Sequence, residues 1–321
     1  MKIAVTGATG FVGSHLIDRL LAEGHEPVAL ARPTSDIRAL SSKRVPVVAG
    51  DVADSEAVRR LVNECDAVIN LARAKAHGRS PPHEVTSVNV DGAQNVAREA
   101  ASAGAEVIHA SSTAVYGSRI AVLPVSENSP VNPDSIYAKS KLDGEFAVNA
   151  ENRKAKILRI SAVLGPRCTS WLGLFRSARD GTLRTVGDGS NVHHPVDVED
   201  VIDAILLCIA RPRSAGVYNI AGPASLSMRE MVSLMAEASG AEPRPRVTPA
   251  ALVSAYSTAG QLAAKIGVTL PRMDSVLFLN GHRSFDISRA RSELGYNPRI
   301  QPPQAIQRTA AWYKSQGLLK D

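Results

Sequence analysis

Short apolar runs alternate with stretches of helical periodicity along the first half of the chain. Residues 2–5 read Lys-Ile-Ala-Val, an apolar, β-branched run without polar alternation, which is typical of a parallel strand buried on both faces. Leu16, Leu20 and Leu21 then recur on one face of a helix. This alternation continues to residue 165 and predicts an α/β fold built on a doubly wound parallel sheet.

A glycine-rich turn joins the first predicted strand to the first predicted helix, in the order Thr6-Gly7-Ala8-Thr9-Gly10-Phe11-Val12-Gly13. In such a unit the first glycine suits a tight turn, the second lets a pyrophosphate approach the backbone, and the third lets the helix pack closely on the strand. Free N–H groups at the helix start attract the anion. We predict dinucleotide binding here, the alternative being a glycine turn without a ligand. The predicted contacts are Gly7, Thr9, Gly10, Phe11, Val12 and Gly13.

A tyrosine and a lysine lie four residues apart in the segment Tyr137-Ala138-Lys139-Ser140-Lys141. Side chains at i and i+4 share one helix face, so the Lys141 ammonium can favour the ionised form of the Tyr137 phenol. A phenol activated in this way can pass a proton to or from a substrate. The pair alone is weak evidence for catalysis, because this spacing arises by chance on many helices.

Together these motifs resemble the extended short-chain dehydrogenases/reductases, which include the NAD-dependent epimerases and dehydratases. TGATGFVG, SSTAVYG, YAKSK, LRISAVLGP and FDISRARSELGYNP occur in family order and cover nearly the whole chain. The resemblance implies a Rossmann fold with Tyr137 as catalytic acid/base, Lys141 on the nicotinamide ribose and Ser112 on the substrate oxygen. Ser111 and Thr113 are the neighbours most easily confused with Ser112. The C-terminal third looks closest to the branch of 3β-hydroxysteroid dehydrogenases and dihydroflavonol-type reductases.

The resemblance also implies cofactor contacts beyond the glycine turn. Asp51 and Val52 are expected to flank the adenine, and the role of Arg73 at the end of the fourth strand is open. The full implied set comprises Asp51, Val52, Leu71, Ala72, Arg73, Asn89, Tyr137, Lys141, Ile160 and Ser161.

The end of the second predicted strand bears on the choice of cofactor. Arg32 stands where an NAD enzyme usually places an acid for the ribose 2′-hydroxyl. An arginine can instead bind a 2′-phosphate through charged hydrogen bonds, and Asp36 lies too far along the loop to replace the acid. We predict NADP(H), with NAD(H) as the alternative.

With 321 residues the chain exceeds the ~150 that one nucleotide-binding sheet needs, so a second, smaller substrate-binding region is expected. We predict a dinucleotide-binding domain over residues 1–165, to which the chain returns near 195–220 and 284–290. Residues 166–321 then form mainly the substrate-binding region. Residues 243–249 are rich in proline and predict an exposed loop.

Substrate-side residues depart from the sugar-nucleotide members of the resembling family. Ala162 stands where those enzymes carry an asparagine, and His193 where they carry an arginine, both of which contact a diphosphate. Arg167, Arg176 or Arg283 could compensate. We therefore predict an NADP(H)-dependent oxidoreductase that interconverts a carbonyl and a secondary alcohol on a hydrophobic, non-nucleotide molecule. One alternative is a nucleotide-sugar epimerase or dehydratase with tightly bound NAD, and another is an NADP(H)-sensing regulator.

Several other patterns refine this picture. We expect one of His193 and His194 to line the substrate pocket and the other to pack, and we expect Asp197 and Asp200 to cap a helix. Apolar side chains in 168–195 and 222–285 suggest a lid over the pocket, against ordinary core packing as the alternative. They are Trp171, Leu172, Leu174, Phe175, Leu252, Val253, Tyr256 and residues 276–279.

Charge, cysteine content and hydropathy argue against a nucleic-acid-binding, disulfide-rich, metal-binding or membrane-spanning protein. The net charge is +6, but the 37 Lys and Arg residues are scattered, so we expect no nucleic-acid partner. Three distant cysteines predict neither a disulfide framework nor a metal site. No apolar run approaches the ~18 residues of a membrane span, and we expect a cytoplasmic protein. The resembling family pairs helices such as 91–103 and 138–150 in a dimer, so we expect a homodimer.

Overall fold

Seven parallel strands form the central sheet in a computed structural model, in the order β11-β6-β5-β4-β1-β2-β3. The structure describes residues 1–74, 82–118, 120–211, 214–243, 246–249, 251–253, 255–256, 258–259 and 281–319. The sheet strands are β1 (Lys2–Thr6), β2 (Glu26–Ala31), β3 (Val47–Ala49), β4 (Ala67–Asn70), β5 (Glu106–Ser112), β6 (Lys156–Ile160) and β11 (Gly216–Ile220).

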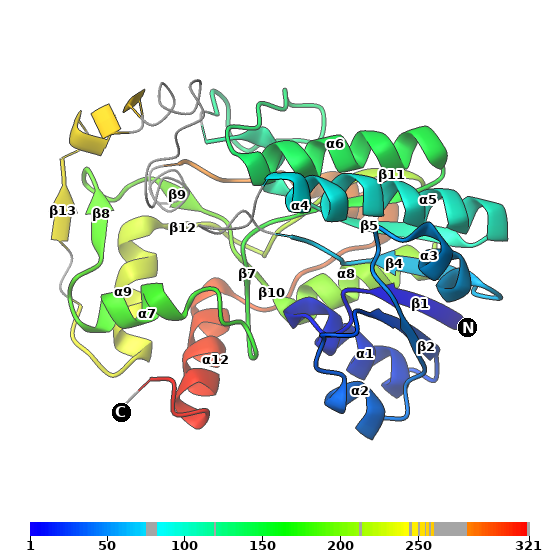
Figure 1. The fold of residues 1–321 in the computed structure, drawn as a ribbon. Coiled ribbons are helices and arrows are strands. Elements are labelled where there is room, and N and C mark those ends of the chain that lie inside the picture. Colours follow the sequence, from blue (N-terminus) through cyan, green and yellow to red (C-terminus); the bar gives the residue numbers. More distant parts are fainter. Residues whose placement is uncertain are drawn as a thin grey trace.

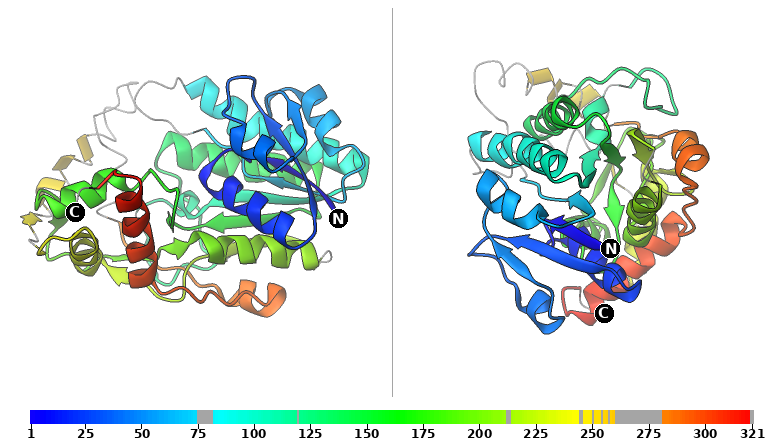
Figure 2. Two further views of the ribbon diagram at one scale, coloured as in Figure 1. Left: turned by 90° about the horizontal axis from the view of Figure 1, so that it is seen from below. Right: turned by 90° about the vertical axis from the view of Figure 1, so that its right-hand side faces the viewer.

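Helices cover both faces of this sheet (Figures 1 and 2). One face carries α1 (Phe11–Ala22) and α8 (Val198–Ala210), and the other carries α3 (Ser55–Val62), α5 (Gly92–Ala103) and α6 (Ile136–Glu151). Successive strand residues point to opposite faces, so Ile108 packs on the α1 side while Val107 packs under α5 and α6. This arrangement confirms the predicted doubly wound α/β fold. Shorter elements on the described part are α2 (Arg38–Ser42), α4 (Pro82–Thr86), a π-helical turn (Ser87–Asp91) and a 3₁₀ turn (Thr113–Tyr116).

Three short strand pairs and three helices lie outside the main sheet. The pairs are β10-β7, β12-β9 and β13-β8, and α7, α9 and α12 share one hydrophobic cluster beside them. Their bounds are β7 (Val163–Leu164), α7 (Leu172–Arg179), β8 (Arg184–Val186), β9 (Val192–His193), β10 (Val196–Asp197), β12 (Leu226–Ser227), α9 (Met228–Ala238), β13 (Arg246–Thr248), a π-helical turn (Ala290–Leu294) and α12 (Pro302–Ser315).

The structure bears on two sequence-based expectations for this region. Trp171 and Phe175 are buried in the cluster of α7, α9 and α12, as the alternative of ordinary core packing expected, while residues 276–279 lie outside the described residues. The prolines around 243–249 do not prevent strand formation, because β13 pairs with β8. The backbone of 246–248 extends between the prolines and joins that edge.

The chain returns to the main sheet after residue 195. There β11 pairs with β6. An isolated bridge outside the sheet places Phe285 beside Val125, where the Asp286 N–H donates to the Val125 carbonyl at 2.8 Å. The division into residues 1–165 and 166–321 stays a proposal.

The start of α8 separates the two aspartates predicted as caps. Asp197 accepts the Glu199 N–H at 2.9 Å and is the N-cap, as expected. Asp200 does not cap the helix: its two oxygens accept the backbone N–H groups of Arg299 and Ile300 at 2.9 and 3.1 Å. This carboxylate therefore fixes the segment that leads into α12, which a local pattern could not reveal.

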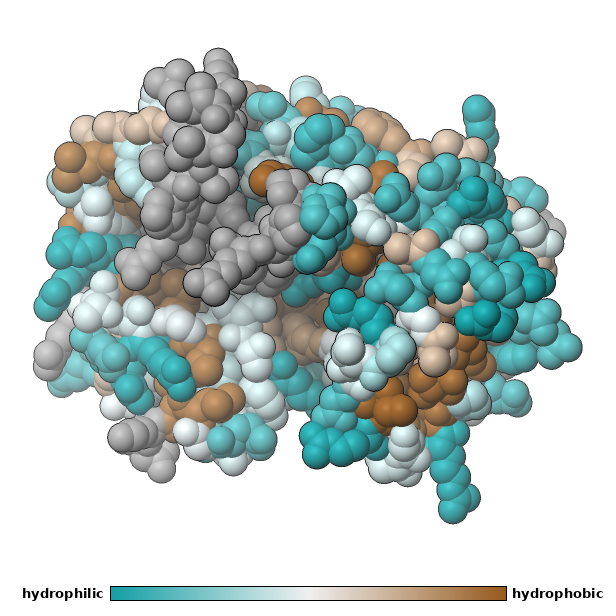
Figure 3. All heavy atoms as spheres, viewed as in Figure 1, coloured by the Kyte–Doolittle hydropathy of each residue, from teal (hydrophilic) through white to brown (hydrophobic). Residues whose placement is uncertain are grey.

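Hydrophilic side chains spread over much of the described surface in Figure 3, and hydrophobic ones gather in separate patches. Among the described residues, no helix combines the length and the apolar character that crossing a membrane requires.

Close packing at the glycine turn gives a stability prediction. A Cβ on Gly13 would lie 2.2 Å from the Gly7 carbonyl oxygen, so Gly13→Ala must push α1 away from β1. We expect a loss of about 1–3 kcal/mol in the free energy of unfolding, measured by urea titration. The control is Gly173→Ala in α7, where an added Cβ meets nothing within 4 Å. Equal unfolding of both variants would contradict the close approach.

Candidate active site

The carboxyl ends of β5 and β6 bring the predicted catalytic serine to the edge of the sheet. Ser112 is the last residue of β5 and pairs in register with Ile160, the last residue of β6. The half-buried Ser112 hydroxyl accepts the Ala114 N–H at 3.2 Å and caps the turn that follows. Its proton therefore remains available for a substrate oxygen.

Helix α6 carries the other two predicted catalytic residues. Ser135 starts the helix by accepting the Ala138 N–H at 3.1 Å, which places Tyr137 in the first turn and Lys141 in the next. The Lys141 ammonium donates to the Ala110 carbonyl of β5 at 2.6 Å, and the residue is only 2% exposed. This bond ties α6 to the strand that ends at Ser112, while Tyr137 stays half-buried at the open end of the helix.

The surroundings of Lys141 lower the pKa of its ammonium group. Burial lowers its pKa to about 8, the Glu145 carboxylate opposes that fall, and the cation of Arg73 adds to it. Arg73, whose role the sequence left open, is thus an exposed cation close to Lys141. The ammonium is still mostly protonated at neutral pH, and it loses its proton more readily than an ordinary lysine.

The glycine turn has the shape that a dinucleotide phosphate requires. Gly7 has φ +68°, and a Cβ there would lie 2.7 Å from the Leu71 backbone. Gly10 is the N-cap of α1 and makes no side-chain cap, so the first N–H groups of the helix keep an open approach. These features fit the predicted cofactor.

Two charged residues near the end of β2 bear on the choice of cofactor, which stays a prediction. Arg32 directly follows β2 and is exposed. Asp36 is held by the Arg38 guanidinium at 2.9 and 2.6 Å, and these hydrogen bonds lower the Asp36 pKa to about 2. Asp36 is therefore already engaged.

Other predicted cofactor residues hold the protein together at this edge. Asn89 accepts the Ala74 N–H at 2.8 Å and donates to the Ala74 carbonyl and the Ser140 hydroxyl at 2.9 Å each, so it clamps the loop after β4 to α6. Val52 is buried, 2.6 Å from where a Cβ of Gly92 would lie, and Asp51 accepts the Ala53 N–H at 3.0 Å. Cofactor contact by these residues stays a prediction.

Further predicted contacts lie at three strand ends. The Leu71 N–H donates to the Thr6 carbonyl at 3.3 Å and the Ala72 N–H donates to the Thr6 hydroxyl at 3.2 Å, which fixes the loop after β4 against β1. Ser161 is buried and donates to the His194 carbonyl. Thr9, Phe11 and Val12 lie at the start of α1, with the Phe11 ring edge-on to His15. Their contact with a cofactor also stays a prediction.

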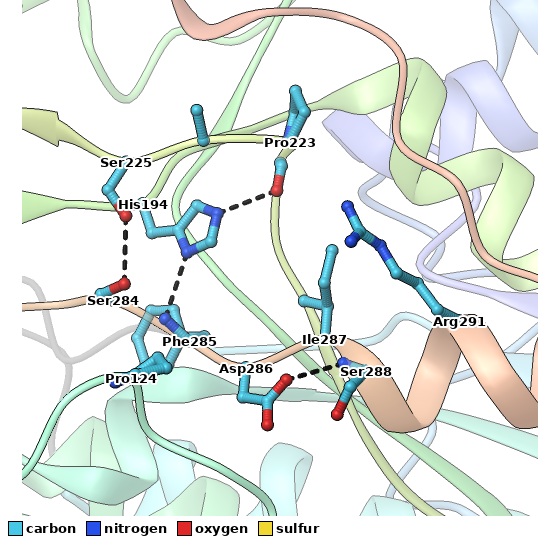
Figure 4. Close-up of a pocket in the computed structure, with 12 residues that line it drawn as sticks. Pro124, His194, Pro223, Ser225, Ser284, Phe285, Asp286, Ile287, Ser288 and Arg291 are labelled. Atoms are coloured by element: carbon cyan, nitrogen blue, oxygen red, sulfur yellow. Dashed lines mark hydrogen bonds between the residues drawn. The ribbon is translucent and has the colours of Figure 1, made fainter.

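The two histidines on the substrate side are both buried. His193 in β9 lies 3.2 Å from the Asn191 amide, and burial with the nearby charge of Arg283 lowers its pKa to about 3, so the ring is neutral. His194 lines a cavity of about 350 Å³ together with Phe285 and Arg291 (Figure 4). Its Nε2 donates to the Gly222 carbonyl at 2.8 Å, and its Nδ1 accepts the Phe285 N–H at 3.1 Å. His194 is thus both a cavity wall and a packing residue, and the trio at β5 and α6 does not line this cavity.

The three arginines proposed to compensate for Ala162 and His193 lie in different places. Arg167 pairs with Asp18 at 2.9 Å, and Arg176 donates to the Leu318 carbonyl at 2.9 Å. Arg283 lies on the segment beside β9 and donates its backbone N–H to the Val192 carbonyl at 2.7 Å. Only Arg283 of the three is beside His193.

One buried ion pair, between Glu145 of α6 and Arg159 of β6, was not predicted from the sequence. Glu145 pairs with Arg159, and its carboxylate also accepts the Ser111 hydroxyl. The signal was present, because Glu145 follows Lys141 by four residues on the same helix face. The Ser111 hydroxyl is therefore bound to Glu145, unlike that of its neighbour Ser112. Across the described residues, no group of three or more His, Cys, Asp or Glu side chains could hold a metal ion.

Known proteins resemble this chain along nearly its whole length. A UDP-glucose 4-epimerase of Mycolicibacterium smegmatis is 30% identical and covers 98% of this chain and 99% of its own. A ceramide reductase of Caulobacter vibrioides is 30% identical, covering 99% of this chain and 96% of its own.

Solved structures share the fold. The structure of gox2253 has a TM-score of 0.85 at 26% identity and covers 99% of both chains. DesIV, a dTDP-glucose 4,6-dehydratase of Streptomyces venezuelae solved with NAD, has a TM-score of 0.77 at 28% identity, covering 98% of this chain and 97% of its own. The finer placement beside the 3β-hydroxysteroid dehydrogenases stays a prediction.

Residues 3–221 match the NAD dependent epimerase/dehydratase family. The motifs, the seven-stranded sheet and the 30% identity over 98% of the chain agree with that match. This chain therefore belongs to the NAD-dependent epimerase/dehydratase family of extended short-chain dehydrogenase/reductase enzymes.

Proposed function

We propose that the protein exchanges a hydride between a nicotinamide cofactor and a carbon that carries a secondary hydroxyl or a carbonyl group. The convergence of Ser112 with the helix of Tyr137 and Lys141 at the ends of β5 and β6 is the main support. The ammonium bond from Lys141 to Ala110 ties these elements together.

The chain's own groups manage the proton and the charge. A bound nicotinamide would supply or accept the hydride. During reduction Tyr137 gives its phenolic proton to the substrate oxygen, and Ser112 donates a hydrogen bond to the same oxygen. The Lys141 cation favours the phenolate that remains, and oxidation reverses these steps.

A nucleotide sugar is the first candidate substrate. The similar proteins include a UDP-glucose 4-epimerase and the dTDP-glucose 4,6-dehydratase DesIV, whose structure holds NAD. In an epimerisation the hydride would leave one face of the sugar carbon and return to the other, without net change of the cofactor. Arg283, beside His193, is the cation that we propose for an anionic part of such a substrate.

A reductase of a hydrophobic, non-nucleotide carbonyl compound is the second candidate. Ala162 and the neutral His193 offer no charged hydrogen bond to a diphosphate, and each such bond is worth about 1.5–3 kcal/mol. The similarity to a ceramide reductase supports this candidate as well. NADP(H) would be its cofactor, as the exposed Arg32 favours.

The reaction is tested by turnover. Purified protein is incubated with UDP-glucose or dTDP-glucose and NAD, and separately with NADPH and a panel of hydrophobic ketones, while sugar products and nicotinamide absorbance are followed. A new sugar without net absorbance change supports the first candidate, and steady NADPH consumption supports the second.

Tyr137→Phe should lower kcat by about 10²–10⁴-fold in either case, because it removes the acid/base proton. A circular dichroism spectrum like that of the wild type is the control, and undiminished turnover would refute the role of Tyr137.

Cofactor choice is tested at Arg32. Replacing a charged hydrogen bond of about 1.5–3 kcal/mol should weaken NADPH binding of Arg32→Ser by about 10–150-fold and leave NADH binding nearly unchanged, as measured by fluorescence titration. Arg59→Ser removes an exposed arginine on α3 that pairs with Glu56, and serves as the control. Tighter binding of NADH than of NADPH by the wild-type protein would contradict the NADP(H) proposal.

We propose a homodimer through α5 and α6. Phe146 on α6 is 60% exposed and Ile136 is 42% exposed, which leaves apolar surface for a second copy. Sedimentation should show a dimer that Phe146→Glu converts to a monomer. Leu21→Glu, at a 38% exposed position on α1, should stay dimeric. A monomeric wild-type protein would rule out this interface.

A further inference from the structure

A buried carboxylate lies on α6 directly below the catalytic pair. Glu145 follows Lys141 by one turn and Tyr137 by two, and it is 3% exposed. The Arg159 guanidinium of β6 grips it with two donors, Nε at 3.0 Å and Nη2 at 2.7 Å. The Ser111 hydroxyl donates to the same carboxylate. One side chain thus joins the helix of Tyr137, the strand β6 and the residue next to Ser112.

The grip on Glu145 is itself anchored. Arg159 Nη1 donates to the Tyr116 hydroxyl at 2.9 Å, and its guanidinium lies 4.9 Å from the centre of the Tyr116 ring. The Tyr116 hydroxyl donates to Asn219 of β11 at 2.8 Å. Asn219 in turn donates to the Val125 carbonyl at 3.0 Å. Because all of these polar side chains are buried and bonded, the guanidinium has little freedom to move.

A buried ion pair is a poor device for stability alone. Packed apolar residues of similar size often serve as well or better, because both charges must leave water. Two planar, bidentate groups instead fix an orientation. A second pair on the same helix shows the contrast: Lys139 and Asp143 lie 2.9 Å apart on the solvent side, where Lys139 is 69% exposed.

We propose that Glu145, held by Arg159, is a positioning residue that fixes the rotation of α6 and so aims Tyr137 at the substrate oxygen beside Ser112 and Lys141 at the cofactor ribose. This inference rests on the proposed function where turnover is measured, and on the predicted contact of Lys141 with the cofactor ribose where binding is measured. It has a second consequence for the charge of Lys141. Because Glu145 opposes the effects of burial and Arg73 on the Lys141 pKa, removing the carboxylate should let this pKa fall further below about 8.

The test compares Glu145→Gln with Asp143→Asn, which removes a carboxylate from the exposed face of the same helix. NADH and NADPH binding is titrated by fluorescence across pH. Lys141 is predicted to hold the ribose in its protonated form, so affinity should fall as pH rises through the Lys141 pKa, and the midpoint for Glu145→Gln should lie about one unit lower. In a turnover assay kcat should drop about 10–100-fold with KM within threefold, since the groups are displaced rather than lost. Asp143→Asn should match the wild type in both measurements.

A double variant guards against simple misfolding. Glu145→Gln alone leaves the Arg159 guanidinium buried without a counter-ion, whereas Glu145→Gln/Arg159→Met removes both charges. Circular dichroism and thermal melting establish that the variants are folded. The double variant should show the lowered kcat and the lowered pH midpoint.

The outcomes separate this inference from the proposed function. If folded Glu145→Gln and the double variant keep the pH midpoint and the kcat of Asp143→Asn, Glu145 is only structural and the proposal is overturned. If Tyr137→Phe turns over like the wild type, the proposed function fails instead, and the pH midpoint of cofactor binding still decides the role of Glu145.

Discussion

The parallel pairing of β5 with β6 is the constraint on which the site depends. It ends both strands at the same level, so that Ser112 lies beside Ile160 at the open edge of the sheet. Helix α6 packs on one face of the sheet and must be held in a fixed position relative to this edge. Two buried contacts hold it there: the Lys141 ammonium on the Ala110 carbonyl, and the Glu145 carboxylate on Arg159. Both place a charged side chain in the buried interior, and each of these charges meets a polar partner.

The predicted chemistry and the smaller elements both lie at this same edge of the sheet. Loops at the carboxyl ends of the strands carry the predicted chemistry, as is usual for open α/β sheets. The segments after β7 and after β11 lie beyond that end, and short strand pairs and the cluster of α7, α9 and α12 support them. Differences among members of the family can therefore accumulate in these segments without disturbing the sheet. Such variation is consistent with the range of activities among the similar proteins.

Local patterns predicted the fold well, because strand, glycine turn and helix are set by neighbours in sequence. The turn at Gly7 and the spacing of Tyr137 and Lys141 belong to this class. The interactions that escaped prediction join distant residues: Tyr116 bonds to Asn219, 103 positions away. Asp200 shows the same limit, because its place in the first turn of α8 suggested a cap while its partners lie near residue 300. The substrate likewise depends on how separate segments meet, which no local pattern contains.

The bonds of His194 have a consequence for the wall of the cavity in Figure 4. One ring nitrogen gives its proton to the Gly222 carbonyl, and the other receives the Phe285 N–H, so the ring joins two segments only in its uncharged form. Burial lowers the His194 pKa and preserves that form. A proton added at Nδ1 would face the Phe285 N–H and take away its acceptor. Neither lysine nor glutamine could replace this side chain faithfully, because the position requires one donor and one acceptor on a single flat ring.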